Sequence, residues 1–247
     1  MKADPFVQIR LLDLQALDST LDRLAHKRKT LPAIAQIQKR DDLVSARQGD
    51  VVLAETTVSD LQRELDKAEA DIEQVRTRKK RDEDRLASGA ITQPKQLEEM
   101  QHEVETLTKR QSDLEDAELE VMERMEEAQK ALDALLAART EHDAARAAAG
   151  EERDREWVAI DAELVTVTED RAKVAPEIPA DLLALYEKVR AAEGGIGAAP
   201  IERGRCGGCH LDLMNNEKVA FRDAPTDEVL RHEECRRILV RTLESGL

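Results

Sequence analysis

Aromatic residues are scarce in this chain of 247 residues: they make up 2% of it, as one Trp, one Tyr and two Phe. Charged residues make up 37%, and there are only 7 prolines. This composition argues against a large globular core and is typical of long helices and coiled coils. Intrinsic disorder is the competing interpretation of so much charge, and the regular spacing of leucine and valine described below argues against it.

Long apolar runs and an even set of cysteines are also missing. No stretch approaches the roughly 18 apolar residues of a membrane span, and the N-terminal MKADPFVQIR leads into an amphipathic pattern, unlike a signal peptide. The chain has three cysteines, which cannot all pair with one another, and their spacing is that of metal ligands. We therefore expect a cytoplasmic protein with no membrane partner.

Positive charge is in deficit, since the formal net charge is −15. Residues 201–247 hold 8 Lys and Arg against 9 Asp and Glu, so almost all of the excess negative charge lies in residues 1–200. Such a surface would repel a phosphate backbone, which disfavours broad binding of DNA or RNA along it. The sequence also lacks a Gly-rich phosphate loop, a nucleophile elbow and a paired-carboxylate pocket, so we expect no enzymatic activity and no small-molecule substrate.

Apolar residues recur at spacings of three and four in two long stretches, residues 44–86 and 97–135. So narrow a stripe suits a coiled-coil partner better than a globular core. Ser88-Gly89 breaks the first stretch, and Pro94 opens the second. We predict a long antiparallel coiled-coil hairpin with its tip at about residues 87–96. An intermolecular parallel dimer is the alternative, and the break between the stretches counts against it.

The flanking segments carry apolar faces of their own. A helix is expected to begin at Pro5 and to break near Pro32, with a stripe of leucines from Leu14 to Leu24. A second stripe consists of Trp157, Ile160, Leu164 and Val167. We expect this second stripe to pack back on the leucines of the first helix.

A short helix is expected at residues 181–190, followed by the glycines of Gly194-Gly195-Ile196-Gly197. The predicted fold class is therefore mostly α, with a small C-terminal zinc ribbon of short β-strands. The predicted parts are a helical hairpin over residues 1–175, a short helix and Gly-rich linker over 176–199, and the ribbon over 200–247.

Metal-ligand spacing occurs twice near the C-terminus, as Cys206-Gly-Gly-Cys209 and as His232-Glu-Glu-Cys235, with 22 residues between the pairs. Structural zinc sites are commonly built from four cysteines or from three cysteines and one histidine. We predict that Cys206, Cys209, His232 and Cys235 hold one structural Zn²⁺. Each pair should lie on a turn between short strands, at residues 200–202 and 237–240.

Three alternatives to this zinc site stay open. The thiols could form an unmetallated cluster or a labile disulfide, or His210 could replace His232 as the fourth ligand. A catalytic zinc site would need an open coordination position and a nearby base, for which Glu233 and Glu234 are carboxylates of the right type.

Two groups of basic residues stand out in this acidic chain. The first lies beside the predicted tip and consists of Arg76, Arg78, Lys79, Lys80 and Arg81, with Lys95 beyond the tip. The second flanks the second ligand pair and consists of Arg231, Arg236, Arg237 and Arg241. Each group is either a solvated surface or a contact for nucleic acid or an acidic protein. Bases are often recognised by stacking on aromatic residues, and Phe221 is the only aromatic residue of the ribbon, so sequence-specific recognition is poorly supported.

The order of these features resembles a known family. A long helical hairpin precedes Leu182-Leu-Ala-Leu-Tyr186, a Gly-rich segment, Cys-Gly-Gly-Cys-His, and a second ligand pair followed by Arg237-Ile-Leu-Val240. This resembles bacterial coiled-coil proteins with a C-terminal four-cysteine zinc ribbon, a family of unknown function. His232 stands where the family pattern has a cysteine, and it retains a zinc-ligating side chain. The resemblance implies a non-enzymatic adaptor or chaperone-like protein that binds a protein partner, nucleic acid, or both.

Overall fold

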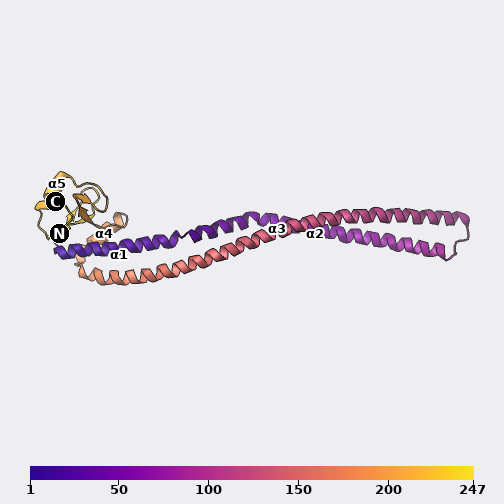
Figure 1. The fold of residues 1–247 in the computed structure, drawn as a ribbon, viewed down its shortest axis with the longest axis horizontal. Coiled ribbons are helices and arrows are strands. Elements are labelled where there is room, and N and C mark those ends of the chain that lie inside the picture. Colours follow the sequence, from indigo (N-terminus) through magenta and orange to yellow (C-terminus); the bar gives the residue numbers. More distant parts are fainter. The chain divides into compact units, whose positions relative to one another are not determined.

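The computed structural model describes residues 1–247, which are mostly helical with a small sheet near the C-terminus (Figure 1). The predicted fold class of a long helical hairpin followed by short strands is confirmed. Two compact units make up the chain. The hairpin unit is residues Gln36–Ala148, and the sheet unit combines Met1–Ala35 with Ala149–Leu247. None of the helices combines the length and hydropathy of a transmembrane segment.

Helices α2 (Pro32–Ala87) and α3 (Pro94–Val174) supply the hairpin unit. Each begins at a proline, which lacks an N–H that the first turn of a helix would leave unpaired anyway. Gly89 adopts a φ of +66° in the connection between them, a left-handed conformation that favours glycine.

Ion pairs between α2 and α3 show the direction and register of this hairpin. Glu64 lies 3.3 Å from the guanidinium of Arg124, and Asp41 lies 2.6 Å from that of Arg146. Early residues of α2 thus face late residues of α3, as an antiparallel pair requires. Between the helices lies a narrow row of buried side chains: Val51, Leu61, Leu65, Ile72, Leu107, Val121 and Leu132.

In the sheet unit, helix α1 (Pro5–Lys29) starts at Asp4, whose carboxylate accepts a 2.9 Å hydrogen bond from the N–H of Phe6. The apolar face of α1 is shared between two clusters. Leu24 packs with Trp157, Ile160, Leu164 and Val167 of α3, together with Leu31 and Ile34. Leu14 instead packs with Leu182 and Tyr186. The predicted packing of the Trp157 stripe therefore holds for Leu24 and is wrong for Leu14, because helix α4 (Ala180–Ala192) covers that part of the face.

The strands of the sheet unit form one four-stranded sheet in the order β2-β1-β4-β3. They are β1 (Ala198–Glu202), β2 (Arg205–Cys206), β3 (Leu230–Arg231) and β4 (Ile238–Val240). Strands β1 and β4 are parallel, and the outer pairs are antiparallel. Helix α5 (Asn215–Asp223) lies between β2 and β3 in the chain. The sequence reasoning anticipated β1 and β4 and missed β2, β3 and α5.

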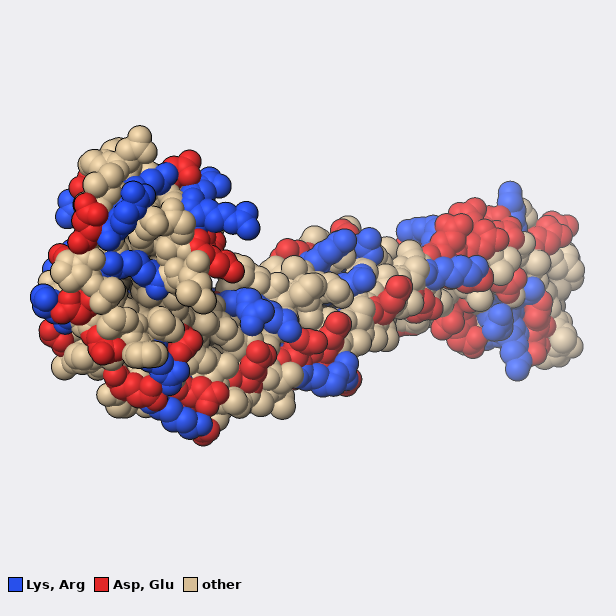
Figure 2. All heavy atoms as spheres, turned by 60° about the vertical axis from the view of Figure 1, so that its left-hand side comes forward, with Lys and Arg blue, Asp and Glu red and all other residues tan.

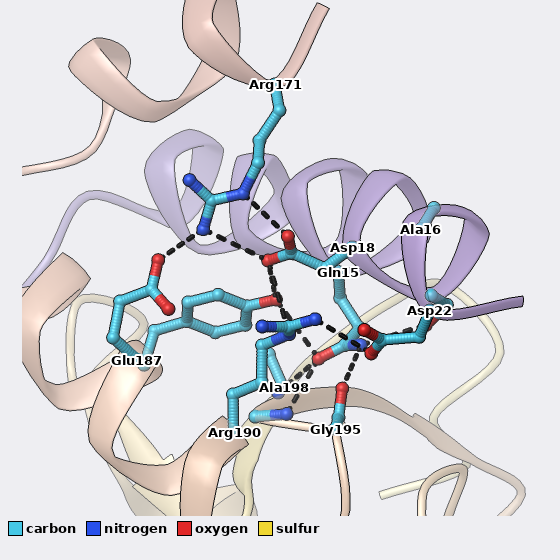
Figure 3. Close-up of polar contacts among 12 residues, drawn as sticks. Gln15, Ala16, Asp18, Asp22, Arg171, Glu187, Arg190, Gly195 and Ala198 are labelled. Carbon is cyan, nitrogen blue, oxygen red and sulfur yellow. Dashed lines mark hydrogen bonds and ion pairs between the residues drawn. The ribbon is translucent and has the colours of Figure 1, made fainter. Parts of the chain in front are cut away.

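Helix α4 (Ala180–Ala192) follows the short helix η1 (Ala175–Glu177) and joins the sheet to α1. Figure 3 shows the buried polar contacts around Asp18 that accompany this packing. Gln15 Oε1 accepts a 2.7 Å hydrogen bond from the N–H of Gly197, immediately before β1. Arg171 of α3 and Arg190 of α4 both reach the carboxylate of Asp18. The hydrogen bond to Asp18 raises the pKa of Arg171 above its ordinary value.

Candidate metal centre

The first ligand pair lies on a tight turn that ends β2 and packs against β1. Gly207 donates a 2.9 Å hydrogen bond to the carbonyl of Pro200. A Cβ atom on Gly207 would lie 3.0 Å from that carbonyl oxygen, and a Cβ atom on Gly208 would lie 2.7 Å from Cδ of Arg237. The two glycines between Cys206 and Cys209 are therefore required by the close approach of their neighbours.

The second ligand pair lies on the turn between β3 and β4. The N–H of Arg236 donates to the carbonyl of His232 at 2.9 Å, and the N–H of His232 donates to the carbonyl of Arg237 at 3.0 Å. Arg236 adopts a φ of +57°, a strained conformation for a residue with a side chain. Because β1 pairs directly with β4, this turn is brought beside the turn that carries Cys206 and Cys209.

The ligand atoms of Cys206, Cys209, His232 and Cys235 all lie within 4.8 Å of one another. His232 Nδ1 lies 3.4 Å from Sγ of Cys209 and 3.1 Å from Sγ of Cys235. The sulfurs of Cys206 and Cys235 are 3.9 Å apart. A tetrahedral zinc ion with bonds of about 2.3 Å to sulfur and about 2.0 Å to nitrogen would give about 3.8 Å between sulfurs and about 3.5 Å between nitrogen and sulfur. The donor set and its spacing thus fit one such ion.

The structure also bears on two of the alternatives, His210 as the fourth ligand and a disulfide between cysteines. His210 is exposed and adopts a φ of +62°, and its ring is not part of the cluster. The three cysteines are free thiols. The arrangement therefore favours His232 over His210 as the fourth ligand.

Burial and hydrogen bonding act in opposite directions on the thiols. Burial raises the pKa of Cys206 to about 12, although N–H groups of Cys209 and Gly208 partly offset it. At Cys209 burial also raises the pKa, but the N–H of Leu211 and hydrogen bonds from the two other thiols outweigh it, so the pKa falls below its ordinary value. A bound cation would favour the thiolates, and its binding would release protons.

Four ligands complete a tetrahedron and leave no coordination position for water or substrate. Cys206 and His232 are buried, whereas Glu233 and Glu234, the two carboxylates that could serve as a base, are exposed. The geometry suits a structural ion better than a catalytic one.

The basic cluster of the hairpin unit is largely paired with acidic neighbours. Arg76 contacts Glu73 and Glu115, Arg78 contacts Glu103, Lys79 lies 4.0 Å from Glu83, and Arg81 lies 3.5 Å from Asp82. Lys80 and Lys95 are exposed and form no ion pair. Figure 2 shows basic and acidic side chains interspersed over the visible face, with no broad positive surface.

The arginines around the second ligand pair fall into two classes. Arg237 donates to the carbonyls of Ile196 and Glu193, and Arg241 donates to the carbonyls of Phe221, Ala224 and Pro225. These two arginines hold loops of the sheet unit. Arg231 donates to the carbonyl of Arg236 and forms no ion pair, and Arg236 has no carboxylate partner.

Arg231 and Arg236 lie at a pocket that sequence reasoning did not find. It has a volume of about 220 Å³ and is lined by Leu185, Lys188, Val189, Ala192, Glu193, Arg231 and Arg236. Lys188 is exposed and also lacks an ion pair. Three unpaired cations therefore surround one pocket with an apolar floor from α4. The pocket joins α4 to the β3–β4 turn, and no sequence spacing predicts that these two segments meet. The only sequence signal for the pocket was the presence of the basic residues.

Comparison with known proteins identifies relatives of the whole chain. The family model described as the CT398-like coiled coil hairpin domain matches residues 14–194. An uncharacterized protein of Mycobacterium tuberculosis is 36% identical over 244 residues, which cover 98% of this chain and 98% of that protein.

Two solved structures share the fold. A structure from Mycobacterium smegmatis has a TM-score of 0.86 and 33% sequence identity, and the match covers 98% of this chain and 100% of that one. The structure of CT398 from Chlamydia trachomatis has a TM-score of 0.68 and 20% identity, with 96% and 98% of the two chains covered. The second likeness concerns the fold alone.

Proposed function

We propose that this chain, which belongs to the CT398-like coiled-coil hairpin family, is a non-enzymatic adaptor or chaperone-like protein that binds protein partners. One structural Zn²⁺, held by Cys206, Cys209, His232 and Cys235, would stabilise the C-terminal part of its sheet unit. The observation that supports a structural, non-catalytic metal site is the convergence of these four ligand atoms within 4.8 Å, because four protein ligands would fill every position of a tetrahedral ion. The reducing cytoplasm is the compartment that would keep the three thiols available.

Zinc would act by folding the C-terminal region. Its strands are short, with two to five residues each, so backbone pairing alone holds the region weakly. Metal binding in small zinc modules supplies about 10 kcal/mol or more of folding free energy. The ion would thereby hold the two turns together and keep the adjoining pocket in shape.

The pocket of Lys188, Arg231 and Arg236 is the proposed docking site for an acidic segment of a protein partner. Three cations that form no ion pair line it, whereas Glu193 is its only acidic lining residue. The apolar side chains of Leu185 and Val189 favour a peptide with both carboxylates and apolar groups over a bare polyanion.

A second surface for protein contact lies on the hairpin unit. A groove of α2 and α3 is lined by four apolar residues, Val58, Leu119, Met122 and Met125, and by four polar ones, Gln62, Glu123, Glu126 and Gln129. Leu119 is 57% exposed and Met122 is 45% exposed. Flexible methionines adapt to different partners, so this groove suits an amphipathic helix.

Binding of RNA or DNA is the alternative function, through the hairpin cluster of Arg76, Arg78, Lys79, Lys80 and Arg81 with Lys95, and through Arg231, Arg236 and Arg237. The unpaired side chains of Lys80, Lys95, Arg231 and Arg236 are the observation in its favour. The carboxylate partners of the other hairpin cations and the carbonyl contacts of Arg237 count against it.

Affinity purification from the native cell tests the proposal, with each lysate divided into nuclease-treated and untreated halves. The bait is the full chain, either unchanged or carrying Arg231→Glu and Arg236→Glu. We expect the unchanged chain to capture proteins from both the nuclease-treated and the untreated lysate. The double variant should fail to capture them. The control is Arg222→Glu, an exposed charge reversal on α5 outside the pocket. Capture that disappears on nuclease treatment would replace the adaptor proposal with the nucleic-acid alternative.

A further inference from the structure

We propose that Glu217 is a positioning residue that holds His232 as an Nδ1 ligand of the metal, an inference that rests on the metal site proposed above. Nδ1 of His232 faces the sulfurs of Cys209 and Cys235, at 3.4 and 3.1 Å. Its other ring nitrogen, Nε2, points away from them. That nitrogen is buried and has no hydrogen-bond partner.

The group nearest to that orphaned nitrogen is a carboxylate. Oε2 of Glu217 lies 3.9 Å from Nε2 of His232, and the two side chains are 1% and 0% exposed. A buried polar nitrogen and a buried carboxylate both cost free energy unless they are hydrogen-bonded. A shift of about 1 Å would bring the pair to the usual length of a hydrogen bond.

Two backbone hydrogen bonds hold the Glu217 carboxylate in this place. Oε2 accepts from the N–H of Met214 at 3.0 Å, at the start of α5. Oε1 accepts from the N–H of Glu233 at 2.9 Å, the residue that follows the histidine. Glu217 therefore ties α5 to the ligand turn, and its remaining acceptor capacity faces the imidazole.

The chemistry of a histidine ligand explains why a carboxylate belongs here. When Nδ1 binds a metal, the proton of the neutral ring is on Nε2. A carboxylate that accepts this proton's hydrogen bond fixes the tautomer, orients the ring and makes Nδ1 a stronger donor. A cysteine ligand at position 232 would have no such proton, and its thiolate would be repelled by a buried carboxylate. Glu217 is thus the partner that a histidine at position 232 needs.

A double-mutant cycle on the full chain separates this role from simple capping of α5. Zinc dissociation constants are measured by competition with a chromophoric chelator for the unchanged chain, Glu217→Gln, His232→Cys and the double variant. Because the glutamine keeps an oxygen for backbone N–H groups, the capping role is partly preserved. We expect Glu217→Gln to weaken zinc binding about ten- to hundredfold with His232 present. In the His232→Cys background, Glu217→Gln should weaken zinc binding only slightly or should strengthen it.

Two controls keep each outcome decisive. Glu234→Gln removes the same charge from an exposed neighbour of the ligands and should leave affinity unchanged. Long-range ¹H–¹⁵N spectra of the zinc-loaded chain should show His232 protonated at Nε2. Equal losses of zinc affinity in the two backgrounds, or a His232 ring protonated at Nδ1, would overturn the role of Glu217 but leave the metal site standing. An unchanged chain that binds no zinc would overturn the metal site itself, and with it this inference.

Discussion

The hydroxyl of Tyr186 donates a 2.7 Å hydrogen bond to the carboxylate of Asp18 and lies 3.2 Å from Oε1 of Gln15, so α4 is tied to α1 across 168 positions of the chain. Tyr186 and Asp18 are almost completely buried. The same carboxylate is paired with Arg171 and Arg190. The stability of the sheet unit therefore depends on one buried acidic side chain and its three partners.

Replacing Asp18 should destabilise the sheet unit strongly. Asp18→Ala leaves the guanidinium groups of Arg171 and Arg190 without their shared carboxylate, and removal of one partner of a buried ion pair costs about 3–5 kcal/mol. The measurement is urea unfolding followed by Trp157 fluorescence, because the only Trp lies in this unit. Asp13→Ala is the matched control on α1. Its carboxylate is 48% exposed, and an exposed pair contributes about 1 kcal/mol or less. Equal effects of the two changes would contradict the buried network.

Tyr186 should make the folded state sensitive to alkaline pH. Burial, and then the hydrogen bond to Asp18, raise the pKa of Tyr186 above its ordinary value of 10.0. The unfolded chain therefore releases this proton first as the pH rises. The stabilising contribution is complete below about pH 10 and declines above it by up to about 1.4 kcal/mol per pH unit. Tyr186→Phe should flatten this decline, which unfolding curves between pH 8 and 11 would reveal. An identical decline in both proteins would assign it to other groups.

Loss of the proposed Zn²⁺ should unfold the C-terminal region and leave the helices intact. Cys206→Ser removes one of the four proposed ligands, a fully buried one. We expect protease cleavage to appear within residues 198–247, while far-UV circular dichroism keeps most of its helical signal. A chelator added to the unchanged chain should reproduce the effect. A collapse of the helical signal throughout the protein would show that the hairpin unit depends on the metal.

Gly208 should be intolerant of a side chain. In Gly208→Ala the new Cβ would meet Cδ of Arg237 at 2.7 Å and Cβ of Ala199 at 3.1 Å. Arg237 is held by the carbonyls of Glu193 and Ile196, so relief of this contact disturbs the turn that carries the ligands. We expect weaker zinc binding by about tenfold or more. Gly150→Ala in α3, where nothing lies within 4 Å, should instead stabilise the protein by about 0.5–1 kcal/mol.

Charge reversal in the hairpin cluster should have little effect on nucleic-acid binding. Arg78, Lys79 and Arg81 already face Glu103, Glu83 and Asp82, so Lys80 is the only reversed residue without an ion pair. Retention of the full chain on immobilised RNA is the measurement, for the chain with Arg78, Lys79, Lys80 and Arg81 all changed to glutamate. Strong retention by the unchanged chain that falls steeply with salt and vanishes in this variant would establish the nucleic-acid function.

The helical hairpin could be predicted because its signals are local. Apolar spacing of three and four over residues 44–86 and 97–135, with glycine and proline between them, determines two helices and the break that separates them. The four cluster residues were also recognisable, since each pair has its own two-residue gap. Such patterns can be recognised in the sequence because the conformation of a helical turn or of a ligand-bearing turn depends on residues close together in the chain.

What the amino-acid sequence determined by itself is thus the helices, their break and the pairs of metal-ligating residue types. Only the tertiary structure decided that Leu14 packs on α4, that α5 places Glu217 behind His232, and that Lys188 joins Arg231 and Arg236 at one pocket. These relationships join residues far apart in sequence. They follow from the pairing of β1 with β4 and from which apolar faces bury each other, and no local spacing encodes either of these.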